Sequence, residues 1–378
     1  IMGIVASIRF IEGVYRSAII GMQKQVLFNK INATMATIRG LGAIIILKWV
    51  SATILAFFFW QGLLSILTLI ILRISTYNCL PKGKRNGRFS ILELKGISQF
   101  ASGMIGITLL KVMLTQIDKV ILSKFLTLTE FGYYTLATTV ASSLLILASP
   151  IIQAFYPKFC ELHARNDTKL LIDSFHKSSR LVSILAGSFC ITMIFFSQAF
   201  LELWTQDVAL ASKVSYLLMI LSIGSLINGL MWIPYQIQLA HQWTKLSFGM
   251  NLVSVIVLVP AIILVVPEYG AIGAAWIWVI LNCGYFFIST SIMHRKILIT
   301  EKWNWYIKDV FYPLILAIVA IMFIKIIFPY PLSIISQLTA LSMAVVIAII
   351  ASGATSKFIR DEFLTIFFDT IKKLNQRK

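Results

Sequence analysis

Eight charged residues lie inside stretches of the sequence that are otherwise apolar, and their types could bind or move an ion. The basic ones are Arg9, Arg16, Arg39, Lys111, Lys119 and Lys325, and the acidic ones are Glu12 and Asp118. Near the centre of a bilayer a charge costs roughly 2.5–3.5 kcal/mol on insertion scales, so it must face a partner or a water-filled cavity. Lys325 lies near the end of its stretch, where its ammonium group can reach the membrane surface. The other seven residues are therefore candidates for a site.

The spacing around Glu12 allows two interpretations. Glu12 lies three residues after Arg9 and four before Arg16, so the three can occupy one face of a helix. One interpretation is a local ion-pair cluster with a structural role. The other is a coupling or gating group beside a cationic cavity.

Asp118 and Lys119 form a second charged position. They are neighbours in the sequence and point to different helical faces, so they cannot neutralise each other well. Lys111 precedes Asp118 by two helical turns, so these two side chains can face the same cavity. Asp118 and Lys119 are therefore predicted to be coupling or gating groups.

A positive surplus remains after these pairings. It comprises Arg39, Lys111 and one of Arg9 and Arg16. A cationic path through a membrane favours an anionic passenger, and guanidinium groups match the oxygen atoms of phosphate. Arg9, Arg16, Arg39 and Lys111 are therefore predicted to line a cationic cavity that binds an anionic substrate.

The sequence indicates neither a metal site nor a cofactor site. The four cysteines are scattered without a CxxC pair, and the four histidines form no HExxH or other ligand spacing. A GxxxxGK[ST] loop is also absent from the sequence, so the chain is not expected to hydrolyse ATP. The energy for transport would then come from an ion gradient, the membrane potential or the flow of substrate.

Composition indicates which elements must hold these charges. Hydrophobic residues make up 58% of the 378 residues and charged residues only 13%, against about 25% charged in soluble domains. A bilayer core takes about 20 apolar residues per helix. Such runs fall at roughly 1–21, 33–51, 53–73, 97–122, 133–157, 180–202, 213–236, 247–266, 271–292, 310–328 and 333–352. The predicted fold is an all-α, polytopic membrane protein with about eleven transmembrane helices.

Basic residues between the runs predict the orientation. If segment 22–32 faces the cytoplasm, 24 of the 33 basic residues lie in cytoplasmic segments, and only Lys48, Lys124 and Lys213 lie in the opposite loops. This bias is typical of the positive-inside rule and places the C-terminus in the cytoplasm. It also explains most of the net charge of +18, so nucleic acid is not predicted as a partner.

Two parts of the sequence show weak similarity to each other. Gln23 and Asn32 are nine residues apart at the start of one apolar run, and Gln242 and Asn251 repeat that spacing at the start of another. Both pairs enter a run from the predicted cytoplasmic side. This pattern favours a parallel internal repeat, as found in transporters that are built from two lobes.

Four segments resemble a known family. They are residues 20–25 (IGMQKQ), 116–123 (QIDKVILS), 131–137 (FGYYTLA) and 148–157 (ASPIIQAFYP). They are similar to segments of the Wzx-type O-antigen flippases, which transport polysaccharide repeat units. These belong to the multidrug/oligosaccharidyl-lipid/polysaccharide (MOP) superfamily of exporters. The resemblance covers most of 1–300 and is most specific between 100 and 160.

The resemblance implies two six-helix lobes and about 14 helices in a complete protein, so about three helices would be missing before this sequence. On that basis we expect the remainder of an N-terminal lobe at 1–75, a basic cytoplasmic inter-lobe loop at 76–96 and a six-helix C-terminal lobe at 97–295. Residues 296–378 would add two helices and a cytoplasmic amphipathic tail, which carries an apolar stripe at Phe358, Phe363, Phe367, Ile371 and Leu374.

The resemblance also implies a function in the bacterial inner membrane. The protein would flip an undecaprenyl-pyrophosphate-linked oligosaccharide to the periplasmic face for O-antigen, capsule or exopolysaccharide assembly. The substrate would move by alternating access, with a proton or sodium ion transported in the opposite direction. Other polysaccharide-assembly proteins would be partners.

Two alternatives are less favoured. A drug or cation exporter of the superfamily would carry more acidic than basic residues in its cavity, the reverse of what is seen. A membrane glycosyltransferase or polymerase would need paired carboxylates in a large loop, whereas outer loops 123–132 and 203–212 hold only Glu130 and Asp207. We therefore expect a transporter and not an enzyme.

Overall fold

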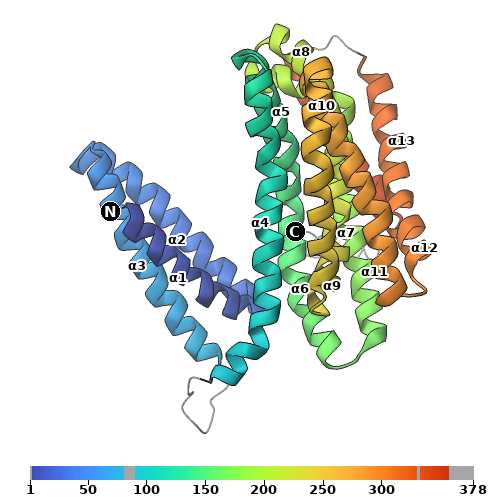
Figure 1. The fold of residues 1–378 in the computed structure, drawn as a ribbon. Coiled ribbons are helices and arrows are strands. Elements are labelled where there is room, and N and C mark those ends of the chain that lie inside the picture. The colour runs from blue at the N-terminus through green and yellow to red at the C-terminus, as the bar shows by residue number, and fades with distance from the viewer. Residues whose placement is uncertain (1, 81–89, 330–332, 357–378) are drawn as a thin grey trace, which may run out of the picture. The chain divides into compact units, whose positions relative to one another are not determined.

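The structure is a computed structural model that describes residues 2–80, 90–329 and 333–356 (Figure 1). Every regular element in these ranges is a helix, which confirms the predicted all-α class. The chain divides into two compact units, Ile1–Ser90 and Ile91–Lys378. The predicted basic loop at 76–96 lies partly outside the described residues, and the predicted amphipathic tail lies wholly outside them.

The first unit is a three-helix arrangement. Its elements are α1 (Met2–Gly21), α2 (Gln25–Ile45), the π-helical turn η1 (Ile46–Val50) and α3 (Ile54–Cys79). Ile19, Phe28 and Leu72 form a small buried cluster that joins the three helices. The side chain of Thr53 accepts a hydrogen bond from the backbone N–H of Ala56 and so caps the start of α3.

The second unit contains the remaining helices. The elements are α4 (Ile91–Phe125), α5 (Leu128–Ser143), η2 (Leu144–Ala148), α6 (Ser149–Ala164), α7 (Thr168–Thr205), α8 (Val208–Leu230), α9 (Trp232–Ala240), α10 (Thr244–Gly284), η3 (Tyr285–Ser289), α11 (Thr290–Lys296), α12 (Lys302–Asn304), η4 (Trp305–Phe311), α13 (Tyr312–Ile327) and α14 (Ile334–Gly353). Asp167 and Asp207 cap α7 and α8, and Thr127 and Glu130 form a capping box at the start of α5.

Nine segments within the described residues are long and apolar enough to cross a membrane. The segment Thr244–Lys296 has 53 residues, about 80 Å as one straight helix, so it is too long for a single pass. It breaks at Gly270, whose φ is +57°, and Lys296 at its end lies over the ring of Trp243, which directly precedes its start, so the two ends lie together. It therefore makes two passes.

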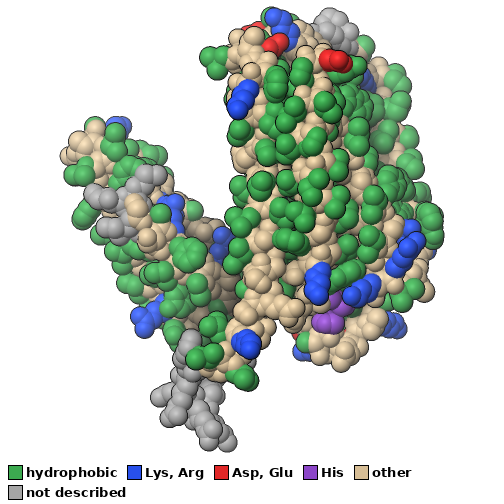
Figure 2. Space-filling model, in the orientation of Figure 1, with side chains coloured by type: hydrophobic (Ala, Val, Ile, Leu, Met, Phe, Trp, Pro, Cys, Tyr) green, Lys and Arg blue, Asp and Glu red, His purple; other side chains and the backbone are tan. Residues whose placement is uncertain are grey.

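Helix α1 corresponds to the first of the eleven predicted spans. It has 20 residues but carries Arg9, Glu12 and Arg16, and it is not among those nine segments. With Thr244–Lys296 counted as two passes, the nine segments make ten, so the eleventh stays a prediction. On the visible face of the second unit, hydrophobic side chains cover the helices and most charged ones lie near the two ends (Figure 2).

The repeated glutamines share a backbone conformation. Gln23 has φ of +58° and Gln242 has φ of +55°, and both follow the end of one helix and precede the start of the next by two residues. Positive φ is uncommon for residues other than glycine. Asn166 and Gln206 have the same conformation two residues before α7 and α8, so this turn is common to several helix connections and the internal repeat stays a prediction.

Candidate functional site

All three predicted arginines lie inside the first unit, and two of them donate hydrogen bonds to α3. Arg9 on α1 donates a hydrogen bond from Nη2 to Oε1 of Gln61 on α3, at 3.1 Å. Arg39 on α2 donates from Nη2 to Oγ1 of the buried Thr68 on α3, at 3.5 Å. Both arginines therefore reach α3 from neighbouring helices.

Trp60 fixes the backbone beside Arg39. Its indole N–H donates to the carbonyl oxygen of Arg39 at 3.2 Å. Its ring fills the space next to Gly42, where an added Cβ would lie 2.1 Å from the nearest ring atom. The close approach of α2 and α3 therefore requires glycine at position 42 and positions Arg39.

Glu12 lies within electrostatic range of Arg9 and Arg39. One of its carboxylate oxygens is buried and accepts no hydrogen bond from the described residues, and Nε of Arg39 is also buried without an acceptor there. The cluster Arg9–Glu12–Arg39 holds two positive charges and one negative charge. It can therefore attract an anion while retaining polar atoms that are not committed to protein partners.

Arg16 does not join this cluster through a hydrogen bond or ion pair that the structure describes. Its guanidinium carbon lies 5.1 Å from the ring centroid of Phe28 on α2. A cation–π contact of this kind stabilises an exposed arginine by about 0.5–1 kcal/mol. The Arg9–Glu12–Arg39 cluster therefore joins α1 and α2, and Arg16 lies apart from it against Phe28.

Asp118 and Lys119 lie on α4 in the second unit. Asp118 accepts a hydrogen bond at 2.7 Å from the hydroxyl group of Tyr134, which is 2% exposed on α5. The backbone N–H of Lys119 donates to the other carboxylate oxygen of Asp118. Lys111 on the same helix is exposed. None of the ion pairs among the described residues includes it, so a shared site with Asp118 stays a prediction.

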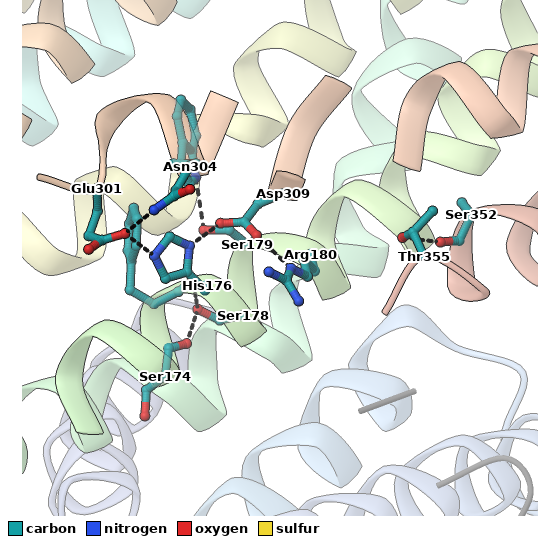
Figure 3. Close-up of polar contacts among 12 residues, drawn as sticks. Ser174, His176, Ser178, Ser179, Arg180, Glu301, Asn304, Asp309, Ser352 and Thr355 are labelled. Atoms are coloured by element: carbon teal, nitrogen blue, oxygen red, sulfur yellow. Dashed lines mark hydrogen bonds and ion pairs between the residues drawn. The ribbon is translucent and has the colours of Figure 1, made fainter. Parts of the chain in front are cut away.

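A second polar cluster was not predicted from the sequence (Figure 3). The fully buried carboxylate of Asp309 accepts a hydrogen bond from Nε of Arg180 at 2.6 Å and also contacts Nδ1 of His176. The other ring nitrogen of His176 lies 3.0 Å from Oε2 of Glu301. His176 and Arg180 belong to α7, and the two acids belong to the segment that leads into α13. Charged contacts therefore attach that segment to α7.

Aromatic packing surrounds this second cluster. The indole N–H of the buried Trp305 donates to Oγ of Ser179 at 3.0 Å, and its ring lies near Phe175, Phe286 and His294. The only advance signal was Asp309 itself, a lone acid at the start of an apolar run. Its partners are more than 120 residues away in the sequence, beyond the reach of spacing arguments.

No group of three or more His, Cys, Asp or Glu side chains in the described ranges has the arrangement of a metal site. The Asp309 cluster contains three such side chains, but Arg180 occupies one oxygen of Asp309 as a positively charged donor.

One comparison with known proteins gives a match. A family model described as "Polysaccharide biosynthesis protein" matches residues 1–207, which is 207 of the 378 residues. The matched part contains all seven predicted site residues and the α7 half of the Asp309 cluster. No curated protein matches the chain.

Proposed function

Because the chain belongs to the polysaccharide biosynthesis protein family, we propose that it flips a lipid-linked oligosaccharide across a membrane. The passenger is an undecaprenyl-pyrophosphate-linked repeat unit, and the products serve O-antigen, capsule or exopolysaccharide assembly. This assigns the chain to the Wzx-type flippases of the MOP superfamily and to transport, not to catalysis.

The observation that carries the proposal is the Arg9–Glu12–Arg39 cluster. Three charged residues inside a membrane are costly, so their retention indicates use. Their net charge of one favours an anionic group, and guanidinium N–H groups match the oxygen atoms of a pyrophosphate. Arg16 in the first unit and Lys111 in the second are proposed as further positive charges for binding the passenger.

The carboxylates are proposed to couple movement to an ion. Glu12 lies near two arginines and can exchange a proton as a phosphate approaches them. Asp118 is held by Tyr134 and can bind a proton or sodium ion in one state of the transport cycle, with Lys119 as a neighbouring gating group. Alternating access then exposes the cationic cluster first to one face and then to the other.

The proposed location is the bacterial inner membrane with the C-terminus in the cytoplasm. The basis is the distribution of lysine and arginine, since cytoplasmic loops are enriched in them. Other polysaccharide-assembly proteins are proposed as partners on the periplasmic side, where the repeat unit would be handed on.

Deletion of the gene in its own cell tests the proposal. The expected result is a build-up of lipid-linked repeat units on the cytoplasmic face, detected by their protection from a sugar-modifying reagent that cannot cross the membrane. Re-expression of the gene should restore transport, which would show that the build-up results from loss of this protein. If unpolymerised units instead reach the outer face in normal amounts, the protein acts after the flipping step and the proposal is wrong.

A further inference from the structure

A pocket of about 440 Å³ lies at one end of the second unit. It is formed where α9 ends, α10 begins, α11 ends and α4 begins. The side chains relevant to binding are Gln99, His241, Gln242, Trp243, Lys245 and Lys296. Small-molecule sites have volumes of about 300–1,000 Å³, so the pocket can hold a ligand head group.

The pocket is cationic. Both charged residues among the described residues that line it are lysines, Lys245 and Lys296. Burial lowers the pKa of His241 below its usual value, so this side chain is neutral at pH 7 and adds no charge. The resulting positive potential selects an anion.

The donors in the pocket suit a phosphate that carries other polar groups. Nζ of Lys296 lies 4.3 Å from the ring centroid of Trp243, a cation–π contact that limits where the ammonium group can move. Lysine binds phosphate as a point charge. The amide groups of Gln99 and Gln242 can donate to ester or hydroxyl oxygens at the same time.

The fold does not need these side chains to form the turn. The turn at Gln23 has the conformation of the turn at Gln242, with φ of +58° and +55°, yet the residues in the positions of Trp243 and Lys245 are Lys24 and Val26. The same turn is thus built without the indole or the second lysine. Trp243 and Lys245 are therefore not explained by the turn, and ligand binding explains them.

The pocket lies where several apolar spans begin or end. It adjoins the ends of three apolar spans, Leu94–Phe125, Val208–Ala240 and both ends of Thr244–Lys296. Span ends lie at the boundary between hydrocarbon and head groups. The anionic groups that a membrane itself supplies at this boundary are the phosphates of its lipids.

From the two lysines, the stacked indole and the position of the pocket, we propose that it binds the phosphate group of a membrane lipid. The ligand is either an anionic phospholipid of the bilayer or a prenyl pyrophosphate carrier. This site lies in the second unit and goes beyond the transport proposal, since lipid could bind there whether or not the protein flips a repeat unit.

Lipid binding to the purified full chain in detergent tests the proposal, with bound lipids counted by native mass spectrometry. The probes are phosphatidylglycerol, farnesyl pyrophosphate, zwitterionic phosphatidylcholine and inorganic pyrophosphate. The wild type is expected to bind one of the first two at least ten times more tightly than phosphatidylcholine. Tighter phosphatidylglycerol identifies a bilayer-lipid site, and tighter farnesyl pyrophosphate identifies a carrier-lipid site.

Variants then locate the site. Lys245→Ala/Lys296→Ala should weaken binding at least tenfold, and Trp243→Leu should weaken it to a smaller extent. Lys124→Ala/Lys213→Ala removes two exposed lysines elsewhere in the same unit and should leave binding unchanged. Lys245→Arg/Lys296→Arg keeps the charge and should retain binding, so the test holds even if the alanine variant folds poorly.

Three results would overturn the proposal. One is equal binding by the wild type and by a folded Lys245→Ala/Lys296→Ala variant. Another is an equal loss in the Lys124→Ala/Lys213→Ala control, which would indicate attraction to any surface lysine. The third is binding of inorganic pyrophosphate as tight as that of either lipid, which would make the lipid part of the ligand irrelevant.

Discussion

Nε of Arg180 on α7 donates a hydrogen bond at 2.6 Å to Oδ1 of Asp309, a residue 129 positions later whose side chain is fully buried. The bond joins α7 to the segment that enters α13. A buried carboxylate is tolerated only when it is paired. The arginine therefore stabilises the attachment of the C-terminal helices to α7.

Arg180→Ala should destabilise the protein by about 3 kcal/mol, the lower part of the range for breaking a buried ion pair, because the Arg180 side chain is partly exposed. The loss is expected as a lower thermal midpoint of the purified protein, followed by tryptophan fluorescence. Arg180→Ala/Asp309→Ala should recover part of the loss, since no unpaired charge remains. Lys169→Ala, an exposed change on the same helix, is the control, and an equal midpoint for it and Arg180→Ala would contradict the account.

The neighbouring Glu301 predicts a response to acid. Its hydrogen bond from Asn304, together with the contact to His176, holds the pKa of Glu301 below its usual value. A carboxyl group whose pKa is lower in the folded state adds stability above its unfolded pKa of about 4.3, and this stability is lost as the pH falls through the folded pKa. Glu301→Gln cannot titrate, so it should lower the midpoint at pH 7 and bring it close to the wild-type value at the acid end. A constant difference between the two proteins from pH 7 to acid would show that the Glu301 charge does not matter.

Two glycines of α2 provide a matched pair. A Cβ at Gly42 would lie 2.1 Å from the Trp60 ring, whereas nothing lies within 4 Å of a Cβ at Gly40. Gly42→Ala should cost about 1–3 kcal/mol through overpacking and should also impair transport, because Trp60 holds the backbone of Arg39. Gly40→Ala should be neutral or gain up to about 1 kcal/mol through helix propensity. If the two variants have the same midpoint and the same export, the proposed close packing of α2 and α3 is absent.

The sequence predicted the helical class and the presence of several membrane spans because both depend on apolar content and length. It also predicted Arg9, Glu12 and Arg39 as functional candidates, because a charge inside an apolar run is conspicuous. Their neighbours were not predictable, since Gln61 and Thr68 are ordinary polar residues whose role depends on how α3 packs. The Asp309 cluster was missed for the same reason, as pairing across more than 120 residues leaves no periodic signal.

Asp118 and Tyr134 separate a chemical role from a structural one. Asp118→Asn removes the charge and should reduce surface polysaccharide if the carboxylate couples an ion. Tyr134→Phe keeps the charge and removes one hydrogen bond, so it should cost about 1–3 kcal/mol in stability with a smaller effect on export. Surface polysaccharide measured at equal protein levels compares them. Normal export by Asp118→Asn would remove this residue from the coupling proposal.

The most direct test of the central claim is export by Arg39→Ala in cells that lack the wild-type copy. Loss of a charged hydrogen bond to the passenger is worth about 1.5–3 kcal/mol, so lipid-linked repeat units should accumulate on the cytoplasmic face while export falls roughly tenfold or more. Arg39→Lys should recover part of the export, and Lys48→Ala in the turn η1 that follows α2 should export normally. Full export by Arg39→Ala, at wild-type protein level, would contradict the claim that this cluster binds the anionic passenger.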